Sequence, residues 1–200
     1  QPSITSTYRI TAIDENAVQS PPSNFYEVQN ISPDIIISAT QIYVDKIQLE
    51  WNISSDSLVT MYHLYRGEQP DDISDLIWSS NNVDGSDMMS YMDMGLDEGV
   101  EYHYAIILEN IEGLVSNYSS PSSFYTNLLA PSDLSIIETL DNDGDGLHDG
   151  FSIDWVDNSE NESGYNIYRR VSTLPTWVIV DTLDANTSTH SENDVLDLNT

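Results

Sequence analysis

The sequence of 200 residues contains no cysteine. This absence excludes disulfides, thiolate metal sites and cysteine nucleophiles together. No stretch approaches about 18 consecutive apolar residues, so a membrane span is not predicted. The first residues, Gln1 to Ser3, are polar and do not resemble a signal peptide. We therefore expect either that a leader has been removed or that the sequence is an excerpt of a longer chain.

Basic residues are scarce. Five of them stand against 34 acidic residues, which gives a formal net charge of −29. A surface of this sign repels polyanions, so binding to nucleic acid or to an anionic membrane is excluded. One explanation is solubility in salty water, where screening weakens self-repulsion and the source is marine or salt-tolerant. The other is that some of the carboxylates bind a metal.

An internal repeat organises the chain. Pro33 and Pro131 lie 98 positions apart and begin corresponding segments. Four blocks match in the same order in the two copies: residues 8–14 with 104–110, 22–26 with 121–125, 47–51 with 151–155, and 62–66 with 165–169. Several matching blocks in the same order are the signature of repeated structural modules.

Each block has the pattern of a β-strand. Apolar and polar residues alternate with a period of two, the apolar ones are rich in Ile, Val, Tyr and Trp, and turn residues flank them. Helical periodicity is not evident. About seven such strands per repeat predict an all-β fold of tandem immunoglobulin-like β-sandwich modules. Proline fixes φ and cannot extend a central strand, so Pro33 and Pro131 suit short, stiff linkers.

Three features of the sequence resemble the fibronectin type III domain. Trp51 and Trp155 match the tryptophan of its second strand, and residues 62–66 and 165–169 match the Tyr-x-x-Tyr-Arg of its third. Residues 96–102 are similar to the leucine, glycine and tyrosine-corner pattern ahead of its sixth strand. The absence of paired cysteines favours this family over disulfide-bridged immunoglobulin domains. The resemblance implies a non-catalytic module of secreted or cell-surface proteins.

The two copies predict three segments of unequal completeness. Residues 1–30 are expected to carry the last two strands, F and G, of a partial module, and residues 33–128 a complete module. Residues 131–200 are expected to carry strands A–E of a second partial module, with an acidic insertion at 141–150 in its A–B loop. The favoured explanation is an excerpt of a longer array. The alternative is strand exchange, in which residues 1–30 of one copy complete residues 131–200 of another.

The inserted segment 141–150 has the spacing of a calcium-binding loop. Oxygen-bearing side chains stand at alternate positions, glycine stands at the sixth and a carboxylate at the ninth. The stretch resembles the calcium loops of thrombospondin type 3 repeats and dockerins. The predicted Ca²⁺ ligands are Asp141, Asp143, Asp145, the backbone carbonyl of Leu147, and Asp149. Ser152 stands where an EF-hand has a bidentate glutamate, and the alternative is a solvated acidic turn.

Signals of catalysis are missing. The four histidines lie in separate segments, and neither a nucleophile elbow nor a phosphate-binding loop occurs. The protein is therefore not predicted to be an enzyme. Trp78 and Trp177 are expected in corresponding middle strands, where packing across the sandwich is favoured over stacking on sugars.

These observations lead to one functional expectation and one alternative. We expect a structural or adhesive module array of an extracellular or cell-surface protein, serving as a spacer, stalk or filament building block and stiffened by calcium. Its expected partners are neighbouring modules of the same longer chain or other copies of it. The alternative is a glycan- or protein-binding accessory region of a larger secreted hydrolase. Fold alone does not separate the two, because this fold carries many functions.

Overall fold

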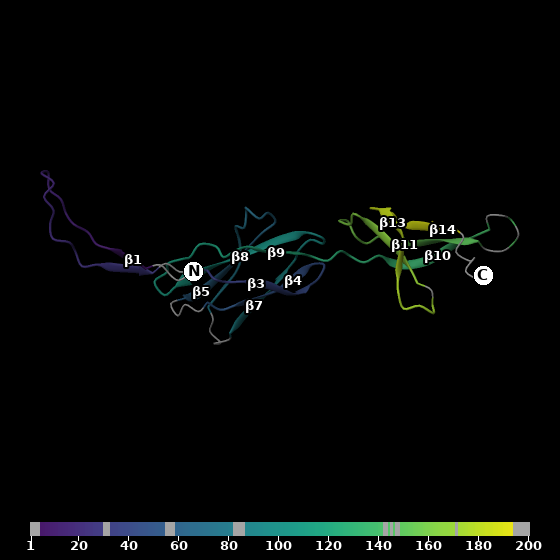
Figure 1. Cartoon of the computed structure of the whole chain (residues 1–200), viewed down its shortest axis with the longest axis horizontal. Coiled ribbons are helices and arrows are strands. Elements are labelled where there is room, and N and C mark those ends of the chain that lie inside the picture. Colours follow the sequence, from purple (N-terminus) through teal and green to yellow (C-terminus); the bar gives the residue numbers. More distant parts are fainter. Residues whose placement is uncertain are drawn as a thin grey trace. The chain divides into compact units, whose positions relative to one another are not determined.

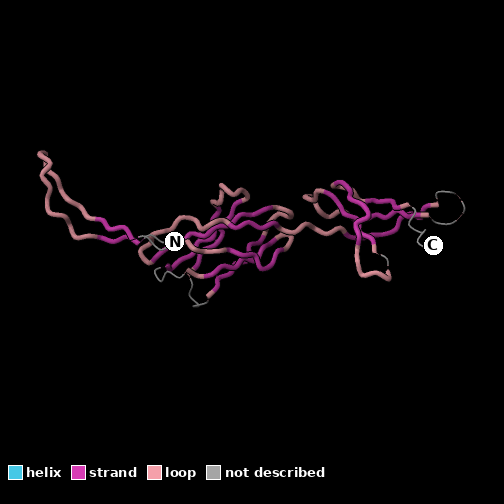
Figure 2. The backbone as a smooth tube through the Cα atoms, in the orientation of Figure 1, coloured by secondary structure: helices cyan, strands magenta, loops and turns pink. Residues whose placement is uncertain are grey.

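The computed structural model describes residues 5–29, 33–54, 59–81, 87–141, 144, 146, 149–170 and 172–193. Within these ranges the protein is all-β, built from antiparallel strands (Figure 1, Figure 2). The strands are β1 (Thr5–Tyr8), β2 (Tyr26–Gln29), β3 (Ile37–Ile42), β4 (Lys46–Asn52), β5 (Val59–Gly67), β6 (Asp75–Ser80), β7 (Met88–Met94), β8 (Glu101–Asn110), β9 (Ser122–Tyr125), β10 (Ser132–Leu140), β11 (Gly150–Val156), β12 (Gly164–Arg169), β13 (Val178–Asp184) and β14 (Thr189–Glu192). The described residues contain no helix capable of crossing a membrane.

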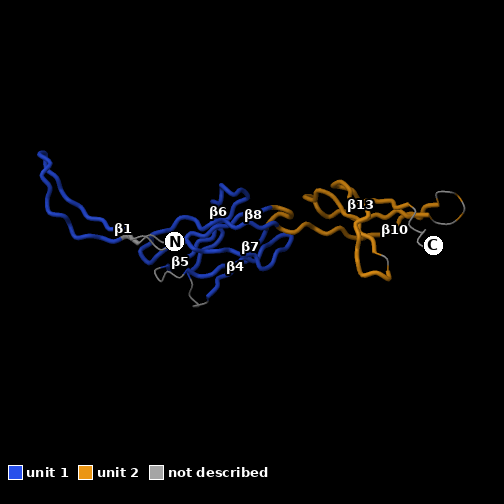
Figure 3. The backbone as a smooth tube through the Cα atoms, viewed as in Figure 1, with its two compact units in different colours: residues 1–95, 101–125 blue, residues 96–100, 126–200 orange. Residues whose placement is uncertain are grey.

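The chain divides into two compact units (Figure 3). Unit 1 comprises residues 1–95 and 101–125, and unit 2 comprises residues 96–100 and 126–200. Unit 1 contains three sheets and the described part of unit 2 contains two, and each unit is described separately below.

Unit 1 contains a two-sheet sandwich. One sheet has the strand order β3-β4-β7, and the other has the order β6-β5-β8-β9. All neighbouring strands are antiparallel. This is the strand order of an immunoglobulin-like sandwich in which β6 pairs with β5 and not with a strand of the opposite sheet. The predicted all-β, immunoglobulin-like fold is therefore confirmed.

The core of unit 1 follows from the alternation seen in the sequence. Along β4, Ile47, Leu49 and Trp51 are at most 1% exposed, while the residues between them lie partly at the surface. On β8, Tyr104 and Ile106 are fully buried. Burying a large apolar side chain contributes roughly 1.5–3 kcal/mol, so these residues supply much of the stability of the sandwich.

A separate β1–β2 hairpin belongs to the same unit. The register runs from Thr5 opposite Gln29 to Tyr8 opposite Tyr26. The hairpin lacks a buried apolar side: its large apolar side chains that the structure describes are each at least 60% exposed, namely Tyr8, Ile10, Ile13, Val18, Phe25 and Tyr26. A strand pair with so much uncovered apolar surface is at most marginally stable by itself.

Unit 2 repeats the plan of unit 1 with fewer strands. Its described sheets have the orders β10-β11-β14 and β12-β13. Trp155 on β11 is 7% exposed and occupies the place that Trp51 has on β4. The core is thinner, however, because Leu134 and Ile136 on β10 remain 70% and 67% exposed. The sandwich of unit 2 is thus open along one side in the described part of the chain.

Candidate functional site

The acidic loop joins β10 to β11 and is closed at its base. Leu140 pairs with Gly150, and the Asp149 backbone N–H donates a 2.7 Å hydrogen bond to the Leu140 carbonyl. At the start of the loop, the Asp141 carboxylate accepts hydrogen bonds from the backbone N–H groups of Gly144 (2.7 Å) and Gly146 (3.0 Å). The chain therefore curls around the first predicted metal ligand.

The two glycines make this curl possible. Gly144 and Gly146 have φ values of +77° and +84°, in the left-handed region that side chains with a Cβ disfavour. The alternation of acidic residues with glycine thus has a conformational reason in addition to a chemical one. A carboxylate offers about four lone-pair sites, and the N–H groups of Gly144 and Gly146 occupy one on each oxygen of Asp141.

The predicted calcium ligands are only partly within the described residues. Asp141 and Asp149 lie at the two ends of the loop, whereas Asp143, Asp145 and Leu147 fall outside the described residues. Among the residues that the structure does describe, no group of three or more His, Cys, Asp or Glu lies close enough to hold a metal ion. The curl around Asp141 fits a calcium loop, and the shell itself stays a prediction.

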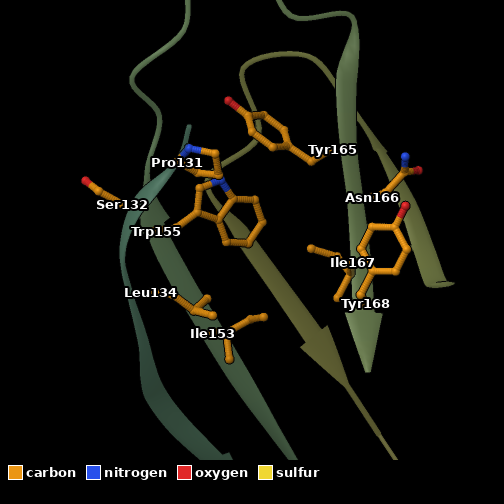
Figure 4. A pocket seen from close by; sticks show the side chains of 9 residues that line it. All are labelled: Pro131, Ser132, Leu134, Ile153, Trp155, Tyr165, Asn166, Ile167 and Tyr168. Carbon is orange, nitrogen blue, oxygen red and sulfur yellow. The ribbon is translucent and has the colours of Figure 1, made fainter. Parts of the chain in front are cut away.

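A cavity of about 240 Å³ lies between the two sheets of unit 2 (Figure 4). It is lined mainly by apolar side chains of β10, β11 and β12, among them Leu134, Ile153, Trp155, Tyr165 and Ile167. In unit 1 the corresponding β4 and β5 positions are at most 3% exposed. The cavity is therefore an uncovered part of the sandwich core, and its lining has the character of a core rather than of a polar ligand site.

An ion pair connects the two sheets of unit 1 and was not predicted. Asp93 on β7 is 2% exposed, and both of its oxygens accept hydrogen bonds from Arg66 Nη1 on β5 (3.1 and 3.2 Å). The Tyr104 hydroxyl on β8 donates to Asp93 Oδ2 (2.9 Å). Burial, followed by the nearby Asp93 charge, raises the pKa of Tyr104, so its hydroxyl keeps its proton. We call Arg66, Asp93 and Tyr104 the sheet clamp.

Unit 2 repeats two of the three groups of the clamp. Arg169 on β12 donates to the Glu192 carboxylate on β14, which places an ion pair between the same two sheets. The pairings agree: Asp93 lies opposite Ile47, and Glu192 lies opposite Phe151, the residue that the repeat aligns with Ile47. The sequence signal for this pair was a single arginine in each Tyr-x-x-Tyr-Arg block. The acidic partner is an aspartate in unit 1 and a glutamate in unit 2, and the sequence pattern does not distinguish either from the rest of the 34 acidic residues.

Glu98 forms a second cluster within unit 2. Its carboxylate accepts hydrogen bonds from the backbone N–H of Leu129 (2.8 Å), the backbone N–H of Glu160 (2.5 Å) and the Ser159 hydroxyl (3.2 Å). The Asn161 side-chain amide donates to the Glu98 carbonyl (2.7 Å). The backbone bonds from Glu160 and Leu129 lower the pKa of Glu98, because they stabilise its charged form.

The two middle-strand tryptophans have different surroundings. Trp78 on β6 packs edge-on against Trp51, with ring centroids 5.4 Å apart, as expected. The expectation for Trp177 is wrong: it precedes β13 and is 57% exposed, with the Arg170 guanidinium 4.8 Å from its ring centroid. The residue in the position of Trp78 is Asp181 rather than Trp177. Asp181 pairs with Ile167 on β12, as Trp78 pairs with Leu64 on β5.

Comparison with known proteins adds structural neighbours only. No protein-family model matches the sequence, and no curated protein matches it. The chain is similar to a two-domain fibronectin type III segment from chicken tenascin, with 14% identity and a TM-score of 0.43 over 80% of this chain and 82% of that one. It is also similar to the sixth fibronectin type III domain of human fibronectin type III domain containing protein 3, with 16% identity and a TM-score of 0.39 over 52% of this chain and 95% of that one.

A third similar structure is the family 28 exopolygalacturonase of Yersinia enterocolitica, with 16% identity and a TM-score of 0.38. The match covers 50% of this chain but spans only 20% of the length of that protein. The description of this chain as tandem fibronectin type III-like β-sandwiches rests on its own strand order and on the repeated features of its two units.

Proposed function

We propose that the chain is a non-catalytic structural segment of an extracellular or cell-surface protein, in which tandem sandwich modules serve as a spacer or stalk. The observation that carries this proposal is the repetition of the sheet-connecting ion pair, Arg66 with Asp93 in unit 1 and Arg169 with Glu192 in unit 2. In both units this ion pair joins one sheet of the sandwich to the other. Charged groups used in this way hold a module together instead of facing a substrate.

Within the proposal, calcium stiffens unit 2 at the loop between β10 and β11. Asp141, Asp143, Asp145 and Asp149 would hold the ion through carboxylate oxygens, and Leu147 through its carbonyl. Support comes from the curl of the described loop residues around Asp141 and from the net charge of −29, which attracts cations. A cation bound there would neutralise crowded carboxylates and fix the end of the β10–β11 hairpin.

Calorimetry with calcium tests this part directly. We expect heat of binding and a higher unfolding temperature for the intact chain, and loss of both in the double variant Asp143→Ala, Asp145→Ala. The matched control is Asp34→Ala, Asp184→Ala, which removes the same charge at two exposed positions outside the loop. Equal binding heats in the intact chain and the loop variant would end the calcium proposal.

The accessory-region alternative has one observation in its favour. Trp177 exposes an aromatic surface in unit 2, and exposed indole rings are common contacts for sugars. Arg170 already lies over this ring, which leaves one face at most for a ligand. A glycan array that shows binding lost in Trp177→Ala supports the alternative. The complete reading frame separates the two further, since a catalytic domain favours the accessory region and additional modules favour the stalk.

A further inference from the structure

The β1–β2 hairpin has the internal architecture of the last two strands of a sandwich. In the hairpin, the Ile10 backbone N–H donates to the Ser23 hydroxyl (3.0 Å). In unit 1, the Ile106 N–H of β8 donates to the Ser119 hydroxyl in the same way (3.0 Å). Both residue pairs are 13 positions apart and correspond to each other at an offset of 96. The match of residues 22–26 with 121–125 predicted from the sequence is therefore wrong by three positions. The hairpin is thus already shaped as the partner of a third strand.

The two hairpins differ in what covers them. Tyr104 and Ile106 on β8 are 0% exposed, because the opposite sheet of unit 1 covers them. Their counterparts Tyr8 and Ile10 are 60% and 76% exposed. The β1–β2 hairpin therefore presents the side chains of a core strand without a core around them.

Unit 2 presents the reciprocal feature. In unit 1, β5 lies between β6 and β8, so both of its edges are hydrogen-bonded. In the described part of unit 2, β12 pairs with β13 alone, and its second edge borders the apolar cavity beside Trp155 (Figure 4). An unpaired edge next to uncovered core is a template for an added strand.

We propose that the β1–β2 hairpin of one copy of this chain docks on the free edge of β12 in a second copy and completes its sandwich. Unit 1 supplies the register, because Tyr62, Leu64 and Arg66 lie opposite Leu108, Ile106 and Tyr104. The repeat converts this into three intermolecular pairs, listed by the β12 residue first: Tyr165 with Ala12, Ile167 with Ile10, and Arg169 with Tyr8. The contact joins two different surfaces, the hairpin of one copy and the β12 edge of the next, so it is heterologous and able to propagate.

One polar group distinguishes this partner from an arbitrary apolar strand. The clamp of unit 1 has three members, and Tyr104 supplies its hydroxyl from β8. Unit 2 has the ion pair of Arg169 with Glu192, whose carboxylate is 15% exposed. Tyr8 stands at the position of Tyr104, so docking brings a tyrosine hydroxyl to Glu192 and completes the clamp. The hairpin therefore matches β12 in register, in shape and in hydrogen-bonding chemistry.

Charge sets the conditions under which the copies meet. Each copy has a formal net charge of −29, so two copies repel one another at low ionic strength. The proposed contact is apolar apart from the clamp, and salt weakens the repulsion without weakening apolar burial. Association therefore grows stronger with added salt, in contrast to a contact formed between opposite charges.

Sedimentation velocity of the full chain over a wide concentration range, at high salt, tests the proposal. We expect concentration-dependent oligomers that Ile10→Asp abolishes, because this side chain enters the completed core. The matched control is Ile13→Asp, which adds the same charge at an exposed position on the opposite side of the strand and leaves association intact. A monomer at every concentration overturns the proposal, and so does equal loss of association in both variants.

A mixing experiment adds a positive readout. The Ile10→Asp chain keeps an intact β12 edge, and an Ile167→Asp chain keeps an intact hairpin. Each is expected to be monomeric alone, while their mixture forms dimers and nothing larger. Tyr8→Phe in the otherwise intact chain is expected to weaken association about tenfold, the effect of losing one hydrogen bond to a charged group. A mixture that stays monomeric, while circular dichroism shows both chains folded, contradicts the proposal.

Discussion

Asp14 and Asn110, 96 residues apart in the sequence, close the same turn in two different hairpins. The Asp14 carboxylate accepts hydrogen bonds of 2.9 Å from the backbone N–H groups two and four residues later, and the Asn110 side-chain oxygen does the same. The residue at the left-handed position is Ala17 (φ 60°) in one turn and Gly113 (φ 77°) in the other. The two hairpins therefore close with the same turn geometry although their side chains differ.

The first prediction concerns this turn. In unit 1, Asn110 is 4% exposed, so Asn110→Ala leaves two backbone N–H groups without their acceptor. We expect a loss of about 1–3 kcal/mol in the free energy of unfolding of unit 1, measured by urea denaturation. Asp14→Ala is the control, because the β1–β2 hairpin is exposed and its turn should not change the unfolding of unit 1. A larger effect from Asp14→Ala than from Asn110→Ala would show that the hairpin is part of that cooperative unit.

The second prediction concerns the sheet clamp. Asp93→Ala removes the partner of both Arg66 and Tyr104 inside the sandwich. Breaking a buried ion pair on one side costs about 3–5 kcal/mol, so we expect unit 1 to lose stability on that scale in urea denaturation. Glu192→Ala in unit 2 should cost less, since Arg169 is 39% exposed and stays hydrated when its partner is removed. Equal costs at the two positions would contradict this difference in burial.

The third prediction concerns acid. The pKa of Glu98 is lowered from its ordinary value of 4.5 by the hydrogen bonds that its carboxylate accepts from Glu160, Leu129 and Ser159. A carboxylate with a lowered folded-state pKa contributes stability above its unfolded pKa and loses it as pH falls through the folded value. The stability of unit 2 is therefore expected not to depend on the protonation of Glu98 between neutral pH and about pH 4.5. Below that pH, the stabilising contribution of Glu98 should be lost as its carboxylate takes up a proton.

The measurement is the unfolding temperature of unit 2 as a function of pH in the intact chain and in Glu98→Gln. The variant is expected to lose stability at neutral pH and to show a smaller further decrease in acid. Glu138→Gln changes the same functional group on β10 and serves as the control. Identical pH profiles for the intact chain and Glu98→Gln would rule out this role of Glu98.

The fourth prediction concerns the acidic loop. Gly146 has a φ of +84°, and its N–H binds the Asp141 carboxylate. Gly146→Ala forces a side chain with a Cβ into the left-handed region, which costs roughly 1–2 kcal/mol. We expect weaker calcium binding by calorimetry with little change in unit 1. Gly95→Ala, at a φ of +74° outside the loop, is the control for the strain itself and should leave calcium binding unchanged.

The sequence predicted the strands well because each is marked by local alternation. Trp51 and Trp155 were placed in matching strands from their neighbours alone, and both are buried as core tryptophans. Trp177 was placed wrongly, because it lies before β13, four positions ahead of Asp181, and Asp181 is the residue that pairs with Ile167 as Trp78 pairs with Leu64. A pattern of period two fixes which residues share a face, but it does not fix where a strand begins.

The sheet clamp was not predicted, for a related reason. Arg66 was visible as part of a repeated motif, whereas its partner Asp93 lies 27 positions later in a methionine-rich strand. A contact between two sheets depends on how the sheets pack, which the strand pattern of either sheet does not contain. The calcium loop is the reverse case, since its ligands are local in sequence and three of the five lie outside the described residues.

The sequence contains no cysteine, so a pair of introduced cysteines gives the most direct test that the β1–β2 hairpin of one copy completes the sandwich of unit 2 in another. A chain with Ile10→Cys is mixed with a chain with Ile167→Cys under oxidising conditions, and each introduced thiol is then the only one in its chain. The account predicts a disulfide-linked dimer in high yield, because the proposed register places the two residues directly opposite one another. Ile13→Cys with Ile167→Cys is the control and should link poorly. Equal yields from the two mixtures, or no linked dimer from either, would contradict the account.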